Sequence, residues 1–376
     1  MYIKRKLQPV IDSKLFKRKA IIISGARQVG KSTLMEKITE SISASILRLN
    51  CDDPDIRNLL SDINNTNLRI LIGSNNFIVI DEAQRVKNIG LVMKRIVDEF
   101  ENVQILASGS SSLQLMSSIN EPLTGRKYEY TLYPVSTGEI YETFGMITTR
   151  QWLERRLIYG SYPDILTHPE EAQELLKSLA ESYLYKDILE LEQIRKSAIL
   201  QKLLIALALQ VGSEVSFNEI GQTIGLDSKT VEKYVDLLEK CFVIYTLHGL
   251  RRNLRNELKK SKKIYFYDTG IRNAIIQNFT PIELRSDMGS IWENFFITER
   301  IKYNSYAGRN VNYYFWRTTA QQEIDFIEEC NGEFSIFEMK WNPKKTNVKF
   351  PDSFIKTYQP KEMNVVTPDN YLEFLV

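Results

Sequence analysis

The chain has 376 residues, of which 43% are hydrophobic and 26% charged, a composition typical of a globular protein with more than one domain. Its 49 basic and 47 acidic residues give a net charge of only +2, so any nucleic-acid contact must come from a local basic patch. Three scattered cysteines and two histidines argue against a zinc site. Because no apolar run reaches transmembrane length and no signal core is present, we expect a cytoplasmic protein with no membrane partner.

A phosphate-binding loop is predicted near the N-terminus. Residues 21–23 indicate a buried strand, the chain breaks at Gly25, and a helix begins near Gly30. Glycines let backbone N–H groups turn toward phosphate oxygens, and the helix presents its positive N-terminal end. Lys31 is expected to reach the β- and γ-phosphates, and the Ser32 hydroxyl to bind Mg²⁺. The residues predicted to bind the nucleotide are Gly25, Ala26, Arg27, Gln28, Val29, Gly30, Lys31, Ser32 and Thr33.

The second half of the predicted nucleotide site follows two further strands. Residues 45–50 predict one strand, and residues 77–80 predict another that ends in the adjacent carboxylates of Asp81 and Glu82. Asp81 is expected to hold Mg²⁺, and Glu82 to orient and deprotonate the attacking water. Small switch GTPases lack this adjacent glutamate, whereas ATPases with an added strand commonly carry it. The sequence therefore favours ATP over GTP.

Three polar residues are candidates for contact with the γ-phosphate. The strand predicted at residues 103–107 ends in a serine-rich stretch, in which Ser108 or Ser110 could sense that phosphate. A helix cap is an equally good interpretation of either serine. Arg126 is a candidate arginine finger toward this chain's own γ-phosphate or a neighbour's, and its alternative is a surface cation. A homo-oligomer is therefore one open possibility.

Four motifs together resemble those of the bacterial and archaeal AAA-type ATPases that carry a C-terminal nuclease-like domain. The motifs are residues 25–32, 79–84, 107–112 and 123–135. The resemblance covers essentially the whole chain. It implies an α/β multidomain protein that begins with a parallel sheet of strand order 5-1-4-3-2 in residues 1–135. The nucleotide would lie at the carboxyl ends of the strands, and a helical lid would follow in residues 136–196.

Residues 197–263 predict a winged helix-turn-helix. Ser216 is expected to cap a second helix, Gly225 to end it, and Asp227 to cap a third. An alternating strand follows the third helix. The third helix would expose residues suited to phosphate and groove contacts, namely Ser228, Lys229, Thr230 and Lys233.

A basic run follows this predicted motif. Seven of the thirteen residues from Arg251 to Lys263 are Lys or Arg. In a chain that is nearly neutral overall, such a concentration favours DNA as a partner. The alternative is a solvated loop beside a winged helix that contacts only protein.

The last predicted domain, residues 264–376, contains a hairpin with an acidic face. A turn at residues 331–332, Asn-Gly, places Asp325 opposite Glu338. It also places Glu323 opposite Lys340, with all four side chains on one face. Two facing carboxylates repel each other, and Mg²⁺ beside Lys340 would satisfy them. The alternative is a plain ion pair between Glu323 and Lys340. The residues predicted to face the core are Ile324, Phe326, Phe337 and Met339.

The acidic hairpin resembles the PD-(D/E)xK restriction-endonuclease-like fold, although Ile324 replaces the proline of the motif name. The resemblance implies catalytic roles for Asp325, Glu338 and Lys340. It also implies metal binding by Asp325, Glu338 and the helical residue Glu293. We therefore expect an ATP-hydrolysing, DNA-binding AAA-type protein with an Mg²⁺-dependent nuclease-like site. The alternative function is a nucleotide-switched DNA-binding or regulatory protein whose nuclease-like domain does not cleave.

Overall fold

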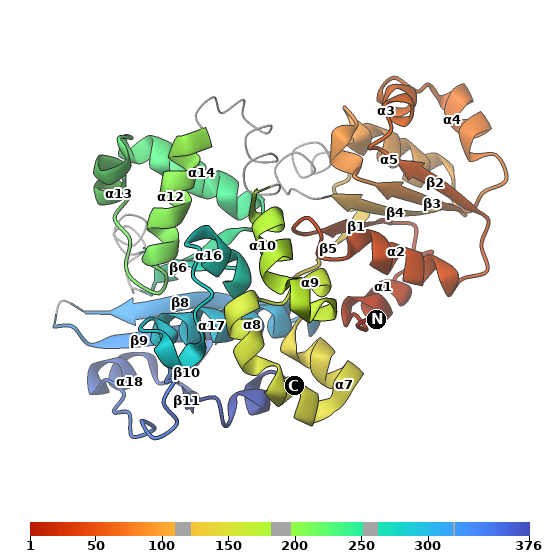
Figure 1. Cartoon of the computed structure of the whole chain (residues 1–376). Coiled ribbons are helices and arrows are strands. Elements are labelled where there is room, and N and C mark those ends of the chain that lie inside the picture. The colour runs from red at the N-terminus through yellow and green to blue at the C-terminus, as the bar shows by residue number, and fades with distance from the viewer. Residues whose placement is uncertain (110–121, 182–196, 251–261, 319) are drawn as a thin grey trace. The chain divides into compact units, whose positions relative to one another are not determined.

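The computed structural model describes residues 1–109, 122–181, 197–250, 262–318 and 320–376 (Figure 1). These residues form two compact units. The N-terminal unit holds residues 2–134 and 240–242, and the C-terminal unit holds Met1 and residues 135–239 and 243–376. Within the described part of the chain, no helix combines the length and the apolar character needed to cross a bilayer.

The N-terminal unit is built on a five-stranded parallel sheet with strand order β2-β3-β4-β1-β5. This is the predicted order 5-1-4-3-2, which is confirmed. The central strands are apolar along almost their whole length because a parallel sheet is covered on both faces. The strands are β1 (Ala20–Ser24), β2 (Ile46–Asn50), β3 (Phe77–Asp81), β4 (Gln104–Gly109) and β5 (Lys127–Thr131).

Five helices accompany the sheet in the described part of this unit, and three of them share a core with it. They are α1 (Leu7–Asp12), α2 (Lys31–Glu40), α3 (Pro54–Ser61), α4 (Asn65–Ile72) and α5 (Ile89–Glu99). Leu60 of α3, Leu68 of α4 and Ile96 of α5 share one core with Ile22 and Ile78 of the sheet. Helix α2 begins directly after the loop that leaves β1, so its N-terminus lies at the carboxyl edge of the sheet.

The C-terminal unit begins with the helices that we predict as a lid. They are α7 (Thr137–Gln151), α8 (Leu153–Tyr159), α9 (Pro163–Thr167) and α10 (Ala172–Glu181). Helices α8 and α10 both pack on α16 (Thr269–Ile275), which comes much later in the chain. As far as it is described, the predicted lid segment therefore belongs to one compact unit with the segments after it. Its residues 182–196 lie outside the described residues.

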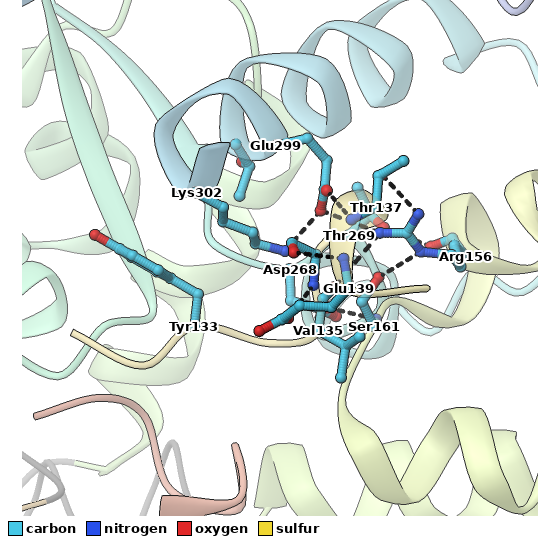
Figure 2. A network of polar contacts seen from close by, with 12 residues as sticks. Tyr133, Val135, Thr137, Glu139, Arg156, Ser161, Asp268, Thr269, Glu299 and Lys302 are labelled. Carbon is cyan, nitrogen blue, oxygen red and sulfur yellow. Dashed lines mark hydrogen bonds and ion pairs between the residues drawn. The ribbon is translucent and has the colours of Figure 1, made fainter. Parts of the chain in front are cut away.

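A buried polar network ties these helices to α17 (Met288–Tyr306), as Figure 2 shows. The guanidinium of Arg156 donates to the Thr137 hydroxyl at 2.8 Å and to the Glu299 carboxylate at 3.1 Å. The same carboxylate accepts from Lys302 at 2.8 Å and from the Thr137 N–H at 2.5 Å. Burial raises the pKa of Glu299, but Lys302 and Arg156 outweigh burial and hold this pKa below its usual range. Two buried cations thus share one carboxylate.

Three helices in the middle of the unit carry the predicted caps. The Ser216 side chain accepts from the Glu219 N–H at 3.3 Å, and Gly225 ends its helix in the left-handed conformation. Asp227 accepts from the Thr230 N–H at 2.9 Å. The Thr230 hydroxyl also donates to Asp227 at 2.6 Å, so Thr230, which we predicted for phosphate and groove contacts, takes part in the cap. The helices are α12 (Ser197–Leu209), α13 (Phe217–Ile224) and α14 (Ser228–Lys240).

A mixed sheet of order β11-β10-β9-β8-β6-β7 completes this unit. Strands β6 (Ile244–Gly249) and β7 (Lys262–Phe266) form an antiparallel pair, and β6 also pairs with β8. The predicted border between residues 263 and 264 therefore falls inside β7. The other elements are β8 (Asn312–Arg317), β9 (Glu323–Cys330), β10 (Glu333–Met339), α18 (Asp352–Tyr358) and β11 (Glu362–Val366).

The predicted register of the β9–β10 hairpin is confirmed. Cys330 faces Glu333 beside the turn, and Phe326 faces Phe337 at the last ladder pair. Asn331 and Gly332, the two turn residues, both have positive φ values, as this kind of turn requires. The turn chemistry thus fixes which residues meet across the hairpin.

The four residues predicted to face the core are all buried, but the predicted alternation of two faces along β9 is wrong because this strand contains a bulge. Tyr314 and Trp316 of β8 face Ile327 and Ile324, so β9 uses one more residue than β8 over this stretch. The extra residue breaks the alternation of side chains. Phe326 packs on the Phe337 ring, at a centroid distance of 5.8 Å. Ile324 instead joins a separate core with Ile327, Ile336 and Phe354.

Candidate functional site

The loop between β1 and α2 contains two glycines at positions where other residues do not fit. Gly25 has a φ of +152°, and a Cβ there would lie 2.2 Å from the carbonyl oxygen of Leu132. Gly30 is the N-cap of α2 and has a left-handed φ of 93°. The loop therefore runs tightly along the backbone of Leu132 before it enters the helix. The glycine spacing of the sequence motif reflects these two steric requirements.

Lys31, the first residue of α2, folds back over the loop. Its ammonium group donates to the carbonyl oxygens of Gly25 at 2.9 Å and Ala26 at 2.8 Å, and the side chain is buried. Phosphate oxygens are stronger acceptors for an ammonium than neutral carbonyls are. Lys31 therefore lies where it can exchange these carbonyls for phosphate oxygens.

Ser32, Asp81 and Ser108 come together at the carboxyl edge of the sheet. Ser32 Oγ donates to Asp81 Oδ2 at 2.8 Å, and Ser108 Oγ donates to Asp81 Oδ1. The N–H of Glu82 donates to Ser108 Oγ at 3.1 Å. Ser108 can make these contacts because β4 lies between β1 and β3. Its role toward the γ-phosphate stays a prediction, and Ser110 lies outside the described residues.

The oxygens of Ser32 and Asp81 fit an Mg²⁺ ion. Hydroxyl and carboxylate oxygens are ligands that this hard cation prefers. Their separation is 2.8 Å. Adjacent ligands of an octahedral Mg²⁺ ion with bonds of about 2.05 Å are about 2.9 Å apart. The pair is therefore spaced as two neighbouring ligands.

Glu82 follows β3 in an uncommon backbone conformation. Its φ of 52° is left-handed, a region that non-glycine residues adopt mainly where the surrounding structure holds them. Gln84 Nε2 donates to Glu82 Oε2 at 2.5 Å and so restrains the carboxylate. The backbone N–H of Glu82 is held by Asp81 and Ser108. Glu82 is thus anchored beside Asp81, which is predicted to bind Mg²⁺, and Ser108, which is predicted to sense the γ-phosphate.

Arg126 lies at the opposite edge of the sheet from the loop. Strand β5 runs parallel to β1, and its last residue, Thr131, faces Ser24 beside the loop. At about 3.3 Å per residue, Arg126 lies roughly 16 Å back from Thr131 along the strand. Its guanidinium pairs with Asp98 at 2.6 Å. The prediction that Arg126 reaches this chain's own γ-phosphate is therefore wrong, while a role toward a neighbouring chain stays a prediction.

Arg5 is a contact of the loop that sequence reasoning missed. Its buried guanidinium donates to the carbonyl oxygen of Val29 at 2.7 Å and to that of Tyr133 at 2.5 Å. Arg5 thus joins the middle of the loop to the segment that follows β5. The only signal in the sequence is a basic N-terminus, which does not distinguish a buried arginine from a solvated one.

In the C-terminal unit, the structure brings Asp325, Glu338 and Lys340 together. Lys340 Nζ lies 2.9 Å from Glu338 Oε2 and 3.9 Å from Asp325 Oδ2. The Asp325 N–H donates to Glu338 Oε1 at 3.3 Å, and the Met339 N–H donates to Asp325 Oδ2 at 3.2 Å. At this end of the hairpin, the backbone N–H groups therefore donate to carboxylate side chains and not to backbone carbonyl oxygens of the facing strand. Burial, assisted by the charge of Asp325, raises the pKa of Glu338 to about 7.

Glu293 of α17 belongs to the same constellation. The Tyr265 hydroxyl donates to Glu293 Oε1 at 2.5 Å, and Lys263 Nζ lies 3.3 Å from the same oxygen. Burial raises the pKa of Glu293 to about 7, and the charge of Asp325 acts in the same direction. Lys263 also pairs with Glu323 at 2.7 Å. Glu323 is therefore engaged by Lys263 and not by the lysine that faces it across the hairpin.

The predicted metal-binding set of Glu293, Asp325 and Glu338 does not fit a metal ion as it is arranged. Among the residues that the structure describes, no three acidic, histidine or cysteine side chains converge in a way that could hold one. The carboxylate oxygens instead contact the ammonium groups of Lys263 and Lys340. This hairpin site, defined by these five residues and Glu323, thus combines four acidic side chains with two lysines.

The basic run is described only at its end, because residues 251–261 lie outside the described residues. Lys262 pairs with Glu232 of α14 at 3.0 Å. Lys263 has only 2% of its side chain exposed, so the predicted DNA contact is wrong for this residue. On α14 the exposed predicted residues are Ser228, Lys229 and Lys233.

The fold and the loop geometry define the N-terminal unit as a P-loop nucleotide-binding domain. Residues 17–141 match the family model described as the AAA domain. Together these findings support a P-loop AAA-type ATPase in this part of the chain. Residues 150–281 and 288–373 match two domains of unknown function, DUF8612 and DUF4143.

The chain is similar over most of its length to several other proteins. It is 26% identical over 331 residues to an uncharacterized protein of Mycobacterium tuberculosis, which covers 87% of this chain and 71% of that protein. It is 24% identical over 318 residues to an uncharacterized protein of Methanocaldococcus jannaschii, and this alignment covers 73% of this chain and 65% of that protein. A solved Walker-type ATPase of Pyrococcus abyssi is 14% identical with a TM-score of 0.51, covering 73% of this chain and 96% of that one. This last likeness shows a shared fold.

Proposed function

We propose that the N-terminal unit binds ATP with Mg²⁺ and hydrolyses it. The observation that carries this proposal is the 2.8 Å contact between Ser32 Oγ and Asp81 Oδ2, with Glu82 held beside it. Lys31 would leave the loop carbonyls for the β- and γ-phosphates. Glu82 would accept a proton from the attacking water and orient it. Mg²⁺ held by Ser32 and Asp81 would neutralise phosphate charge.

Two substitutions separate nucleotide binding from turnover. Lys31→Ala should abolish detectable ATP binding, because the loop loses the ammonium group that is folded over it and would reach the phosphates. Glu82→Gln should keep ATP binding and lower turnover by at least about 100-fold, since a general base contributes that much or more. Glu101→Gln, an exposed glutamate paired with Arg18, is the matched control and should change neither quantity. Turnover at the wild-type rate in Glu82→Gln would refute the assignment.

We also propose that the C-terminal unit binds DNA through α14 and the basic run. Lys229 and Lys233 lie four residues apart on α14, and both are exposed. Residues at this spacing share one face of a helix and suit contact with successive phosphates. Because Lys262 and Lys263 are engaged within the chain, the proposed contribution of the basic run comes from residues 251–261.

Charge reversal tests this proposal. Lys229→Glu with Lys233→Glu should weaken DNA binding and reduce the slope of affinity against salt concentration, because two fewer phosphates are neutralised. Lys177→Glu with Lys356→Glu makes the same change of charge at exposed positions of other helices and should leave the slope unchanged. Equal effects of both pairs would mean that only the net charge of the protein matters.

For the hairpin site, we propose the non-cleaving alternative. Support comes from the lysines that contact its carboxylates, with Lys340 at 2.9 Å from Glu338 and Lys263 at 3.3 Å from Glu293. The chain would then act as an ATP-driven DNA-binding protein. DNA incubated with the protein and Mg²⁺ or Mn²⁺, with and without ATP, should remain intact. Cleavage that is lost in Asp325→Ala would overturn this part of the proposal.

A further inference from the structure

A buried lysine lies among the carboxylates of the hairpin site, and it comes from the basic run. Lys263 Nζ lies 2.7 Å from Glu323 Oε1 and 3.3 Å from Glu293 Oε1, and the side chain is 2% exposed. The same ammonium lies 5.3 Å from the centre of the Phe315 ring. Two carboxylates and an aromatic face therefore enclose it, and each of these groups attracts a cation.

Lys263 and Lys340 divide the carboxylates of the site between them. Lys263 contacts Glu293 and Glu323, and Lys340 contacts Glu338 at 2.9 Å and Asp325 at 3.9 Å. A divalent cation needs several oxygens at about 2 Å at the same time. In this site one oxygen of each carboxylate already lies within 4 Å of a lysine ammonium group.

We infer that the Lys263 ammonium takes the place of a divalent cation in the hairpin site. Pairing of β7 with β6 brings this lysine to the sheet whose strands β9 and β10 carry Glu323, Asp325 and Glu338. Lys263 neutralises Glu293, the helical carboxylate that the nuclease-like resemblance implies as a metal ligand. The folded chain therefore does not bind Mg²⁺ or Mn²⁺ at this site. This inference concerns the hairpin site alone and does not involve the Mg²⁺ that would accompany ATP.

Mn²⁺ binding without nucleotide, measured by electron paramagnetic resonance, tests the inference. Lys263→Met removes the charge and keeps an unbranched side chain. A positive charge roughly 5 Å from a divalent ion weakens its binding by at least about tenfold, even at the dielectric constant of water. Lys263→Met should therefore bind Mn²⁺ at least about tenfold more tightly than the wild type. Adding Asp325→Asn should remove this gain, which would locate the bound ion in the hairpin site.

Two further variants keep the test decisive. Lys262→Met changes the neighbouring lysine, whose partner is the exposed Glu232, and should leave Mn²⁺ affinity unchanged. If Lys263→Met does not fold, the double variant Lys263→Met with Glu323→Gln takes its place in the experiment. It removes the charges of both residues of the 2.7 Å pair, so that no buried charge is left without its partner. Mn²⁺ affinity equal to that of the wild type in the folded variant would overturn the inference. Wild-type binding that is already tight and is lost in Asp325→Asn would overturn it as well, whatever the outcome of the ATP and DNA assays.

Discussion

Replacing Glu299 with glutamine should strongly destabilise the C-terminal unit. The substitution preserves the size of the side chain and its oxygen acceptor for the Thr137 N–H. It removes the only charge that faces both Arg156 and Lys302 in the network of Figure 2. The side chains of Arg156 and Lys302 are 0% and 2% exposed, so water cannot take over the lost interaction. Removing one partner of a buried ion pair costs about 3–5 kcal/mol, and here one carboxylate serves two cations.

Tryptophan fluorescence is a specific assay for this unit. The four tryptophans are residues 152, 292, 316 and 341, all of which lie in the C-terminal unit. With a urea m value of about 2–3 kcal/mol per M, a loss of 3–5 kcal/mol lowers the unfolding midpoint by about 1 M or more. Glu333→Gln breaks an exposed pair with Lys361 at 2.8 Å and serves as the matched control, with a midpoint near the wild type. Equal midpoints for Glu299→Gln and Glu333→Gln would refute the reasoning.

The pH dependence of the same comparison follows from the sign of the pKa shift. Glu299 has a folded-state pKa below its ordinary value of 4.5, so its ionised form stabilises the fold above about pH 4.5. The contribution is lost as the pH falls through the folded pKa and the carboxylate takes up a proton. The difference in the free energy of unfolding between the wild type and Glu299→Gln should therefore have its largest value at pH 7 and decrease below pH 4.5. A difference that stays constant down to pH 3 would show that the carboxylate charge is not responsible.

Three other predictions concern single residues. Gly25→Ala should lower affinity for a fluorescent ATP analogue by about tenfold or more, since its Cβ would lie 2.2 Å from the Leu132 oxygen; unchanged affinity would mean that the loop is not fixed there. Ser108→Ala should lower ATP turnover by about tenfold with little change in binding, because Asp81 loses a hydrogen-bond donor; equal losses in both would contradict a positioning role. Burial raises the pKa of Asp268 to about 6, so its contribution to the free energy of unfolding should fall as the pH rises from about 4 to 6. A carboxyl ¹³C resonance that titrates near pH 6 and is missing in Asp268→Asn would confirm this.

Local sequence patterns predict the parts of the structure that depend on neighbours in the chain. Continuous apolar runs such as residues 77–80 predict strands buried on both faces, and the structure contains those strands. Turn residues 331–332 predict the hairpin register, because a two-residue turn leaves one pairing of the strands. The strand order itself came from the resemblance to AAA-type ATPases. In each case the information lies within a few residues or within one known motif.

Features that depend on distant partners could not be predicted in this way. The bulge in β9 moves Ile324 and Phe326 to different cores, and it depends on how β9 fits against β8. Arg5 finds its acceptors 24 and 128 residues away, at Val29 and Tyr133. No periodic pattern in the sequence marks either feature, because both arise from contacts between separate segments.

At the end of the basic run, strand periodicity distinguishes a lysine that faces the hairpin site from one that does not. Side chains of successive residues in a strand point to opposite faces, so Lys263 and Tyr265 share one face of β7 and Lys262 has the other. Lys263 and Tyr265 both contact the same oxygen of Glu293, whereas Lys262 pairs with Glu232 of α14. If residues 262–266 are interpreted as a strand, the alternation separates the two lysines. If they are interpreted as the end of a charged loop, both lysines count toward DNA binding. Where β7 is taken to begin therefore determines whether Lys263 is assigned to the hairpin site or to DNA binding. The comparison of Mn²⁺ affinity between Lys263→Met and Lys262→Met tests this assignment directly.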